Sequence, residues 1–377
     1  MTTNRRKTLG VRPFADLSRY LRIGRQIQLA DAHYRVSPFT ILPIFLKLTL
    51  IDKFSPSEIF GYGLLSPSLT DEDRRKYLSK EKSLRLLRGL NPSAHACLVE
   101  DKILFYKYCG GLGLPIPKLF AVIERGRVLT PDGQPVTVPT QWESLLRASA
   151  RDDFVIKPAG GVYGRGLEIY SRVNDEYEDK SRDRHSARGV YAKTIANSDY
   201  DRFLLQERLR DHPDLRRLSQ SKGLQSARFN TFLEEAGDVK LLFYMLKVIS
   251  GDNLIDNFES GSTGNLIAVG EPDTGRLRYA YALDSSGFGL KRIDHHPVTG
   301  LPFSDFQIPF WKEARQLVLR AANHFLPLRA IGWDVAITPT GPRLLEGNVW
   351  WDPTNYAPEL ISQSQWDLLA RVSREIC

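Results

Sequence analysis

The order of hydrophobic and polar positions predicts a helical beginning. Up to about residue 90, basic residues lie between leucines and isoleucines, and three Ser-Pro pairs are typical of helix boundaries. The apolar run 39–51 predicts a buried helix. In residues 71–90, charges alternate with leucines every three or four positions, which predicts an amphipathic surface helix. We therefore expect residues 1–90 to form a helical cover that carries no chemistry of its own.

Beyond a break at Asn91 and Pro92, the pattern changes to short strands separated by helices. Residues 96–123 predict a helix that ends at Gly110 and Gly111, followed by a turn and a short buried strand. The elements expected next are a hairpin or loop at 125–139, a helix at 141–150 and strands at 154–157 and from 167. A polar excursion that is mobile or lies on the surface is expected at 174–201, and a strand at 203–209.

The C-terminal part predicts antiparallel strands. Two apolar runs, 226–235 and 239–249, predict a hairpin, and two shorter strands follow around a turn at 273–275. Residues 311–325 have the apolar stripe of a helix. The adjacent pair His295 and His296 has no third ligand at zinc spacing, so structural or substrate-orienting roles are favoured over a metal site.

Composition narrows the class of protein. With 377 residues, of which 42% are hydrophobic and 25% charged, the chain is long enough for two or three subdomains around a sizeable core. The net charge of +8 suits anionic partners such as nucleotides, nucleic acid, acidic glycans or a membrane surface, and does not choose among them. Because the aromatic residues lie in apolar runs and not among basic clusters, no specific nucleic-acid partner is expected.

The cysteines and the start of the chain favour a cytoplasmic location. Cys97, Cys109 and Cys377 have neither metal-ligand spacing nor the even count of a disulfide framework, so a reducing compartment is expected. The first residues lack the apolar core of a secretory signal. The run 39–51 is shorter than the roughly 20 residues that span a bilayer, so no transmembrane segment is expected. Peripheral contact of this run with a membrane remains an alternative.

A lysine followed by a glycine-rich loop is the first candidate site. Lys157 lies at the end of a predicted strand and precedes Gly160, Gly161, Gly164 and Gly166. Glycine lets backbone N–H groups approach an anion closely, as a phosphate-covering loop requires. The GK[ST] ending of a P-loop and the strand-to-helix context of GxGxxG are both missing. An ordinary hairpin turn with a solvated lysine is the alternative.

A set of oxygen ligands is the second candidate site. Asp334 lies on a predicted strand, a turn follows at 338–341, and Glu346 and Asn348 lie two apart on the returning strand, on one side of it. Such oxygens, with those of phosphate, are the ligands that Mg²⁺ takes in nucleotide sites. The two candidate sites together predict one site for ATP and Mg²⁺, with Mn²⁺ as an alternative ion. Turn capping by Asp334, pairing of Glu346 with Arg343, and loop support by Asn348 are the alternative roles.

Several segments together resemble the ATP-grasp superfamily, the fold of D-alanine:D-alanine ligase and related enzymes. The segments that carry the resemblance are KPAGGVYGRG from Lys157, LLQERL, SARFNT, and GWDVAI with RLLEGN. DKILF, IDNFESG, HHPVTG and IPFWKEA are similar to its sugar-transfer-associated branch, which is related to alpha-L-glutamate ligases. The resemblance covers about residues 55–350 and implies an α+β fold in which two α+β lobes clasp ATP, with an N-terminal helical region. The implied divisions are an N-terminal helical region (1–90), an N-terminal or central ATP-grasp subdomain (91–150), the glycine-loop lobe (151–210) and a C-terminal metal-binding lobe (211–377).

The resemblance implies roles at the nucleotide. Lys102 and Lys157 match the two lysines that contact ATP, and the second of these touches the α- and β-phosphates. The loop from Gly160 to Gly166 matches the one that closes over the phosphates. Gln206, Glu207 and Leu209 match the hinge strand that meets the adenine, where D-alanine-type ligases begin with an acidic residue in place of Gln206.

The resemblance also implies roles at the reacting centre. Arg228 matches the arginine that stabilises phosphate or an acyl-phosphate, and Lys247 and Asn257 match positions near the reacting atoms. Asp334, Glu346 and Asn348 match the Mg²⁺ ligands. The family's glycine-rich segment after Asn257 departs from the pattern, because here it is DNFESGSTGN.

In enzymes of this superfamily a substrate carboxylate attacks the γ-phosphate, and an amine then captures the acyl-phosphate. The leading hypothesis is therefore an ATP-dependent carboxylate–amine ligase that acts on a small-molecule acid and amine and releases ADP and phosphate. One alternative is a kinase-like phosphotransferase acting on a hydroxyl of a small molecule or sugar. Another is a nucleotide-binding scaffold without turnover, or a basic nucleic-acid binder. The sequence specifies neither the substrates nor the oligomeric state.

Overall fold

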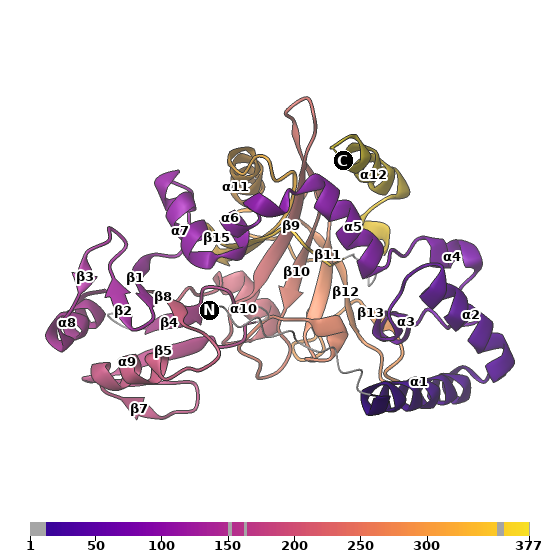
Figure 1. The fold of residues 1–377 in the computed structure, drawn as a ribbon, viewed down its shortest axis with the longest axis horizontal. Coiled ribbons are helices and arrows are strands. Elements are labelled where there is room, and N and C mark those ends of the chain that lie inside the picture. The colour runs from indigo at the N-terminus through magenta and orange to yellow at the C-terminus, as the bar shows by residue number, and fades with distance from the viewer. Residues whose placement is uncertain (1–12, 150–152, 162–163, 353–357, 377) are drawn as a thin grey trace, which may run out of the picture.

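Two antiparallel sheets and the helices around them organise the part of the chain that the structure describes. The structure is a computed structural model, and it describes residues 13–149, 153–161, 164–352 and 358–376. Figure 1 shows the first sheet (β1–β8) at the left, the second sheet (β9–β15) in the centre, and a group of N-terminal helices at the right.

The first sheet has eight strands in the order β3-β2-β1-β8-β4-β5-β6-β7. Helices α8 (Pro139–Ser149) and α9 (Ala187–Ile195) cover it, and Phe154 stacks on Tyr170 in the core between them. The strands are β1 (Leu119–Glu124), β2 (Arg127–Leu129), β3 (Pro135–Val136), β4 (Asp153–Pro158), β5 (Glu168–Val173), β6 (Glu176–Glu178), β7 (Arg184–His185) and β8 (Arg202–Glu207).

The second sheet has seven strands in the order β13-β12-β11-β10-β9-β14-β15. Helix α11 (Trp311–His324) packs on one of its faces. The strands are β9 (Ser226–Leu233), β10 (Val239–Val248), β11 (Leu266–Gly270), β12 (Leu277–Leu283), β13 (Leu290–Ile293), β14 (Ala330–Thr338) and β15 (Gly341–Asn348). These elements confirm the predicted hairpin, the two shorter strands and the predicted helix at 311–325.

Side-chain alternation in the second sheet separates the core from the candidate site. Phe229 of β9 and Tyr244 of β10 stack with Trp311 of α11, at ring-centroid distances of 5.4 and 4.3 Å. The neighbouring residues Arg228 and Lys247 point to the opposite face, since successive side chains of a strand alternate. The apolar face thus fixes the sheet on α11, and the polar face is left for chemistry.

The remaining helices lie mostly before the first sheet. They are α1 (Pro13–Tyr34), α2 (Pro38–Leu50), α3 (Pro56–Gly61), α4 (Asp71–Arg75), α5 (Lys80–Leu90), α6 (Cys97–Glu100), α7 (Lys102–Gly111), α10 (Pro213–Ser219) and α12 (Gln363–Ile376), with short 3₁₀ turns at Ser93–His95, Glu259–Gly261 and Pro358–Leu360. Helix α7 ends at Gly111, as predicted. None of the helices in the described ranges is long and apolar enough to cross a membrane.

The N-terminal helices differ from two expectations. Ser37 and Ser55 cap α2 and α3 in front of a proline, as the Ser-Pro pairs predict. However, α2 is not a buried helix, because only one side of it faces the core. The predicted helix at 71–90 is also wrong as a single element. It is divided into α4 and α5, because the hydroxyl of Ser79 accepts a hydrogen bond from Lys82 N and starts a new helix there.

The excursion predicted at 174–201 does lie at the surface, but it is not a loose segment. It contains β6, β7 and α9, which complete the edge of the first sheet. The buried Asp179 holds the segment together, since it accepts hydrogen bonds from the backbone amides of Ser181 and Asp183 and from Lys193, and its Oδ2 lies 2.9 Å from the His185 ring. A buried carboxylate with so many partners orders a segment that its polarity alone predicts to be loose.

Candidate functional site

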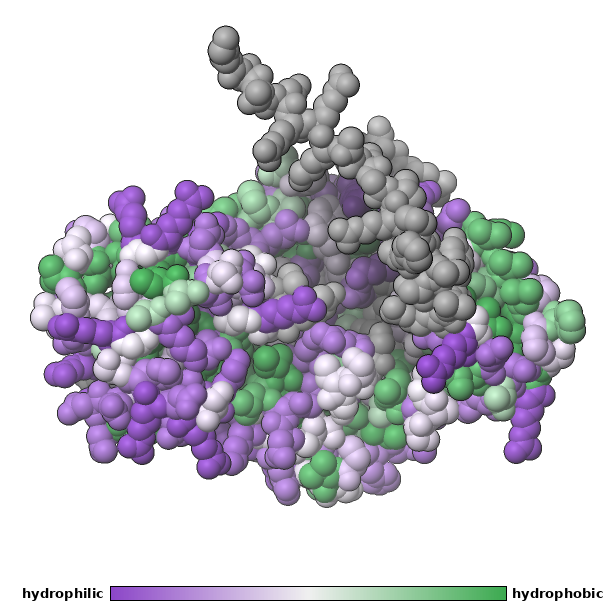
Figure 2. Space-filling model, turned by 60° about the horizontal axis from the view of Figure 1, so that its bottom comes forward, coloured by the Kyte–Doolittle hydropathy of each residue, from purple (hydrophilic) through white to green (hydrophobic). Residues whose placement is uncertain are grey.

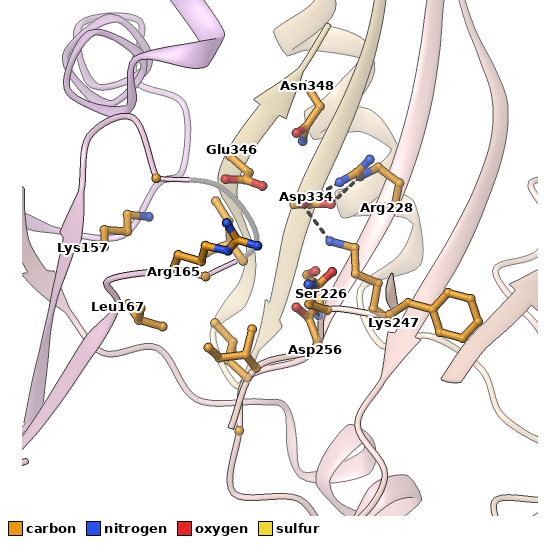
Figure 3. Close-up of a pocket in the computed structure, with 18 of the residues that line it drawn as sticks. Lys157, Arg165, Leu167, Ser226, Arg228, Lys247, Asp256, Asp334, Glu346 and Asn348 are labelled. Carbon is orange, nitrogen blue, oxygen red and sulfur yellow. Dashed lines mark hydrogen bonds and ion pairs between the residues drawn. The ribbon is translucent and has the colours of Figure 1, made fainter. Parts of the chain in front are cut away.

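A cleft of about 1240 Å³ runs between the two sheets, lined by segments far apart in the sequence. One wall consists of β4, the loop after it and the end of β8, and the other of β9, β10, β14 and β15. Figure 3 shows Lys157 on the first wall and Asp334 on the second. Since small-molecule sites typically occupy roughly 300–1,000 Å³, the cleft has room for more than one ligand.

Asp334 is the centre of the charged cluster on the second wall. It lies opposite Arg228 of β9 on one side and Glu346 of β15 on the other. Arg228 donates from Nε to Oδ1 at 2.5 Å and from Nη2 to Oδ2 at 2.9 Å, and Lys247 donates from Nζ to Oδ2 at 2.9 Å. Burial by itself raises the pKa of Asp334, but Arg228 and Lys247 outweigh it and hold this pKa well below its ordinary value.

Two amide side chains, Asn230 and Asn348, lie on the same face of the second sheet as Asp334 and Glu346. Gly332 lies between Asn230 of β9 and Asn348 of β15. A Cβ atom at Gly332 would lie 3.2 Å from Asn230 Nδ2, so glycine leaves the space that the amide needs. Asn348 donates to Gly332 O at 3.3 Å, which leaves its Oδ1 available. The buried Asn230 Oδ1 has no hydrogen-bond partner within the described part of the chain.

Glu346 pairs across the cleft and not along its own strand. Asp101 caps α7 through the first amides of the helix, which places Lys102 in its first turn. Lys102 Nζ donates to Gly161 O at 2.7 Å and lies 3.3 Å from Glu346 Oε2. The alternative partner Arg343 donates instead to neighbouring oxygens of its own hairpin. Lys102 therefore connects the glycine loop to the carboxylate row, which consists of Asp334 and Glu346.

Lys157 is a desolvated cation and not a solvated turn residue. Its Nζ donates to Tyr106 Oη at 3.0 Å and lies 4.8 Å from the centre of the Tyr106 ring. Burial lowers the pKa of Lys157 to about 8, although Glu346 opposes this shift. A lysine held in this way with few polar partners is suited to receive an anion.

The glycine loop has the backbone that its sequence predicts. Gly164 and Gly166 have φ values of 69° and 73°, where other residues are strained. A Cβ at Gly164 would also lie 2.9 Å from Ile255, and one at Gly166 would lie 2.7 Å from Pro158. Gly160 and Gly161 line the cleft as well, whereas residues 162 and 163 of the predicted loop lie outside the described residues.

The predicted hinge lines the end of the cleft next to β4. Gln206 is buried in β8, and its Oε1 accepts no hydrogen bond from any described residue. Glu207 accepts a hydrogen bond from Lys118 N at 2.8 Å, so this carboxylate already anchors β8 to the chain before β1. Leu209 lines the cleft beside both.

Asn257 lies at the rim of the same cleft. Its Nδ2 donates to Glu259 Oε1 at 2.7 Å, and its carbonyl accepts from Thr263 and Asn265. Asn257 therefore braces the DNFESGSTGN loop. A role for Asn257 near the reacting atoms stays a prediction.

Sequence analysis missed several polar residues that the fold brings into the cleft. Ser226 and Asn230 share the cleft face of β9 with Arg228, and alternation along SARFNT would have identified them. Asp256 accepts from Ser226 N at 2.7 Å and Ser226 Oγ at 2.5 Å. Burial raises the pKa of Asp256. Tyr106 had no sequence signal, because its position depends on packing between the lobes.

The N-terminal region also contributes to the cleft, contrary to the expectation that it carries no chemistry. Ser55, Ser57, Glu58 and Tyr62 of the α3 segment and Lys80 of α5 line the end beyond the carboxylate row. The N-terminal helices thus line part of the cleft, in addition to its two walls.

The donor set fits a metal ion bound together with phosphate. Asp334, Glu346 and Asn348 present hard oxygen atoms on one face. Within the described residues no group of three His, Cys, Asp or Glu side chains forms a metal cluster, and both carboxylates are paired with cations. These cations are themselves suited to phosphate. A metal–nucleotide complex would supply both sets of partners at once.

Comparison with known proteins identifies the family of the chain. A family model described as sugar-transfer associated ATP-grasp matches residues 81–356, which is most of the chain. No curated protein sequence matches it.

Solved structures resemble the chain only distantly. The biotin carboxylase domain of 2-oxoglutarate carboxylase from Hydrogenobacter thermophilus, in complex with MgADP, ADP and bicarbonate, is 12% identical, with a TM-score of 0.40 over 74% of this chain and 46% of that one. The D-alanine-D-alanine ligase from Coxiella burnetii is 10% identical, with a TM-score of 0.43 over 74% of this chain and 59% of that one. D-alanyl-alanine synthetase A from Vibrio cholerae is 9% identical, with a TM-score of 0.44 over 75% and 66%. The chain thus spans about half to two thirds of the length of these proteins, and the likeness assigns no activity.

Proposed function

The chain belongs to the sugar-transfer associated ATP-grasp family, and we propose that it is an ATP-dependent ligase that joins a small-molecule carboxylate to an amine. The observation that supports this most strongly is that four cations and two carboxylates from both lobes meet in one cleft. They are Lys102, Lys157, Arg228 and Lys247 with Asp334 and Glu346. Such a cleft suits a nucleotide triphosphate more than any neutral ligand.

The first wall is assigned to the nucleotide. Lys102 and Lys157 are the proposed phosphate ligands, and the glycine loop covers the phosphates. Val155 and Ile169 form apolar surface next to Gln206 at the other end of this wall. A planar base fits between such side chains, and the unpaired Gln206 Oε1 would accept a hydrogen bond from its amine.

The second wall is assigned to phosphoryl transfer. Bound Mg²⁺, or Mn²⁺ in its place, would neutralise charge on the transferred group, and Asp334, Glu346 and Asn348 would hold it. Arg228 and Lys247 exchange Asp334 for phosphate oxygens and stabilise their charge. In the reaction, a carboxylate oxygen attacks the γ-phosphorus and ADP leaves. The amine nitrogen then attacks the acyl carbon, phosphate leaves, and the amine loses a proton.

The substrates are assigned to the end lined by the N-terminal region. The side chains of Ser55, Glu58 and Lys80 line this part of the cleft. Glu58 accepts hydrogen bonds from Ser55 and from Lys80 N, and Lys80 Nζ pairs with Asp352. Polar groups of both signs suit an acid and an amine. The free thiols of Cys97 and Cys109 support a reducing, cytoplasmic setting.

A thermal-shift screen of carboxylates and amines with ATP and Mg²⁺ tests the proposal, because a bound substrate raises the melting temperature. Acid and amine pairs that stabilise the protein are then assayed for amide, ADP and phosphate. Formation of AMP and pyrophosphate would contradict the proposal. A stable phosphorylated product without any amine would instead indicate the phosphotransferase alternative.

A further inference from the structure

Helix α2 carries an apolar face that no described part of the chain covers. Ile41, Phe45 and Leu48 point to the core, while the opposite side is exposed. Figure 2 shows hydrophobic residues gathered at the right-hand edge, where Figure 1 places α2. The large exposed side chains are Phe39 (87%), Leu42 (44%), Leu46 (45%), Leu50 (63%) and Ile51 (67%).

The exposed residues form one stripe. Positions 39, 42, 46 and 50 recur every three or four residues, which is the spacing of a single helix face. Exposed apolar residues scattered singly need no explanation, but a continuous stripe of this kind is typical of a surface that binds something.

The same segment carries nearly all of the protein's net charge. Residues 1–53 contain ten basic and three acidic residues, a net charge of +7. The other 324 residues contain 42 basic and 41 acidic residues, a net charge of +1. Most of the net charge of +8 therefore lies, along the sequence, in the segment that contains α2, although residues 1–12 with four of its basic side chains lie outside the described residues.

Cations also flank the stripe in space. Arg35 lies just before α2 and Lys53 just after it, and both are exposed and form no ion pair with a described residue. Two acids of this region are already paired, Asp52 with Lys82 and Asp71 with Lys47. Arg35 and Lys53 thus remain as exposed cations at the two ends of the stripe.

We propose that this face of α2, with the basic residues on either side of it, docks the protein on an anionic lipid bilayer. Apolar side chains on one side of a helix enter the boundary between headgroups and acyl chains, while neighbouring lysines and arginines contact the anionic headgroups. Nucleic acid would use the charge and leave the apolar stripe in water. A bilayer uses both features, and this is independent of the ligase proposal.

The position of the face suggests what docking achieves. Helix α3 follows α2 directly, and Ser55 and Ser57 in this segment line the cleft. A bilayer in contact with α2 would therefore lie on the side of the molecule that contributes α3 to the cleft, and that such docking serves a substrate rests on the proposed function.

Vesicle sedimentation of the full-length protein tests the proposal. We expect binding to phosphatidylcholine vesicles that contain phosphatidylglycerol, and at least about tenfold weaker binding to phosphatidylcholine alone or at high salt. The variant Leu46→Glu/Leu50→Glu should bind the anionic vesicles at least about tenfold more weakly. Arg35→Gln/Lys53→Gln should weaken binding by a smaller factor and reduce its salt dependence.

The matched control is Ile195→Glu, because Ile195 is 46% exposed at the end of α9 and Leu46 is 45% exposed on α2. It should bind vesicles as the unaltered protein does, and circular dichroism establishes that every variant is folded. Absence of binding to anionic vesicles would overturn the proposal, and so would unchanged binding of Leu46→Glu/Leu50→Glu. A dimer that the same variant converts to a monomer, without vesicle binding, would assign the face to a second copy of the chain instead.

Discussion

Asp334 has two tasks at the scale of single residues. Before any ligand is bound it balances Arg228 and Lys247 inside the protein, and in the proposed reaction it turns to the metal ion. Glu346 is less buried and has one cationic partner, Lys102. The two carboxylates should therefore respond differently to loss of their charge.

Replacement of Asp334 by asparagine should lower both activity and stability. It leaves the partly buried Arg228 and Lys247 without their shared counter-ion, and breaking a buried ion pair typically costs about 3–5 kcal/mol. Glu346→Gln should lose activity and stay within about 1 kcal/mol of the unaltered protein, since its pair is partly exposed. Urea unfolding measures the difference. Equal stability of the two variants would contradict the role of Asp334 as a counter-ion.

Lys157 should make nucleotide affinity depend on pH. Its pKa of about 8 means that the nucleotide-free protein loses this proton well below the ordinary value of 10.5. ATP affinity should therefore fall above pH 8, by up to about tenfold per pH unit, because the neutral amine no longer attracts phosphate. Calorimetric titration between pH 7 and 9.5 measures this, and Lys157→Met should bind weakly with a flat profile.

The same shift has the opposite effect on folding. Between about pH 8 and 10.5 the unfolded chain holds the Lys157 proton and the folded chain does not, so this group makes the free energy of unfolding rise with pH.

An ATP affinity that does not depend on pH, or that Lys157→Met leaves unchanged, would contradict the assignment of Lys157 to phosphate.

At the scale of elements, alternation along strands explains how the site could be predicted at all. A period of two places Arg228 on the cleft face of β9 and turns Phe229 toward α11. It also places Glu346 and Asn348 on the same side of β15. What alternation does not predict is the bulge at Leu345 of β15, where Asp334 pairs with Glu346 but the next residue, Val335, pairs with Leu344. There Tyr106 donates to Leu345 O, a contact that requires packing of α7 on the sheet.

Gly332 should be essential for the positions of the neighbouring amide side chains, Asn230 and Asn348. Gly332→Ala would bring a Cβ within 3.2 Å of Asn230 and 3.3 Å of Arg228, so both side chains must shift. We expect turnover to fall by about tenfold or more, since small displacements of charge-stabilising groups are costly in catalysis. Gly111→Ala, where the added Cβ meets nothing within 4 Å, is the control for alanine insertion. Equal turnover of Gly332→Ala and Gly111→Ala would contradict this role of Gly332.

Asn91 should hold the N-terminal region against the second sheet. Its buried amide donates to Ala330 O and Val349 O and accepts from the backbone amides of Arg329 and Ala330. Asn91→Ala leaves these backbone groups unpaired, and we expect a loss of about 2–4 kcal/mol in the free energy of unfolding. Asn91→Asp keeps the acceptor only and should lie between the two in urea unfolding. An unaffected Asn91→Ala protein would refute this anchoring role.

At the scale of the whole molecule, local patterns predicted many of the strands, and the resemblance implied two lobes with the lysine, the loop and the carboxylates between them. The sequence did not predict that α3 and α5 complete the cleft, or that residues 174–201 are ordered by Asp179. Both depend on contacts between distant parts of the chain, which leave no periodic signal in either segment.

The central claim is that the two lobes bind ATP together with a divalent metal ion. The most direct measurement is calorimetric titration of a non-hydrolysable ATP analogue into the full-length protein, with Mg²⁺ and with EDTA, for the unaltered protein and for Glu346→Gln and Lys157→Met. We predict that binding with Mg²⁺ is at least about tenfold tighter than with EDTA, that Glu346→Gln loses this advantage, and that Lys157→Met binds weakly under both conditions. Absence of binding, or equal affinity in all three proteins, would contradict the account.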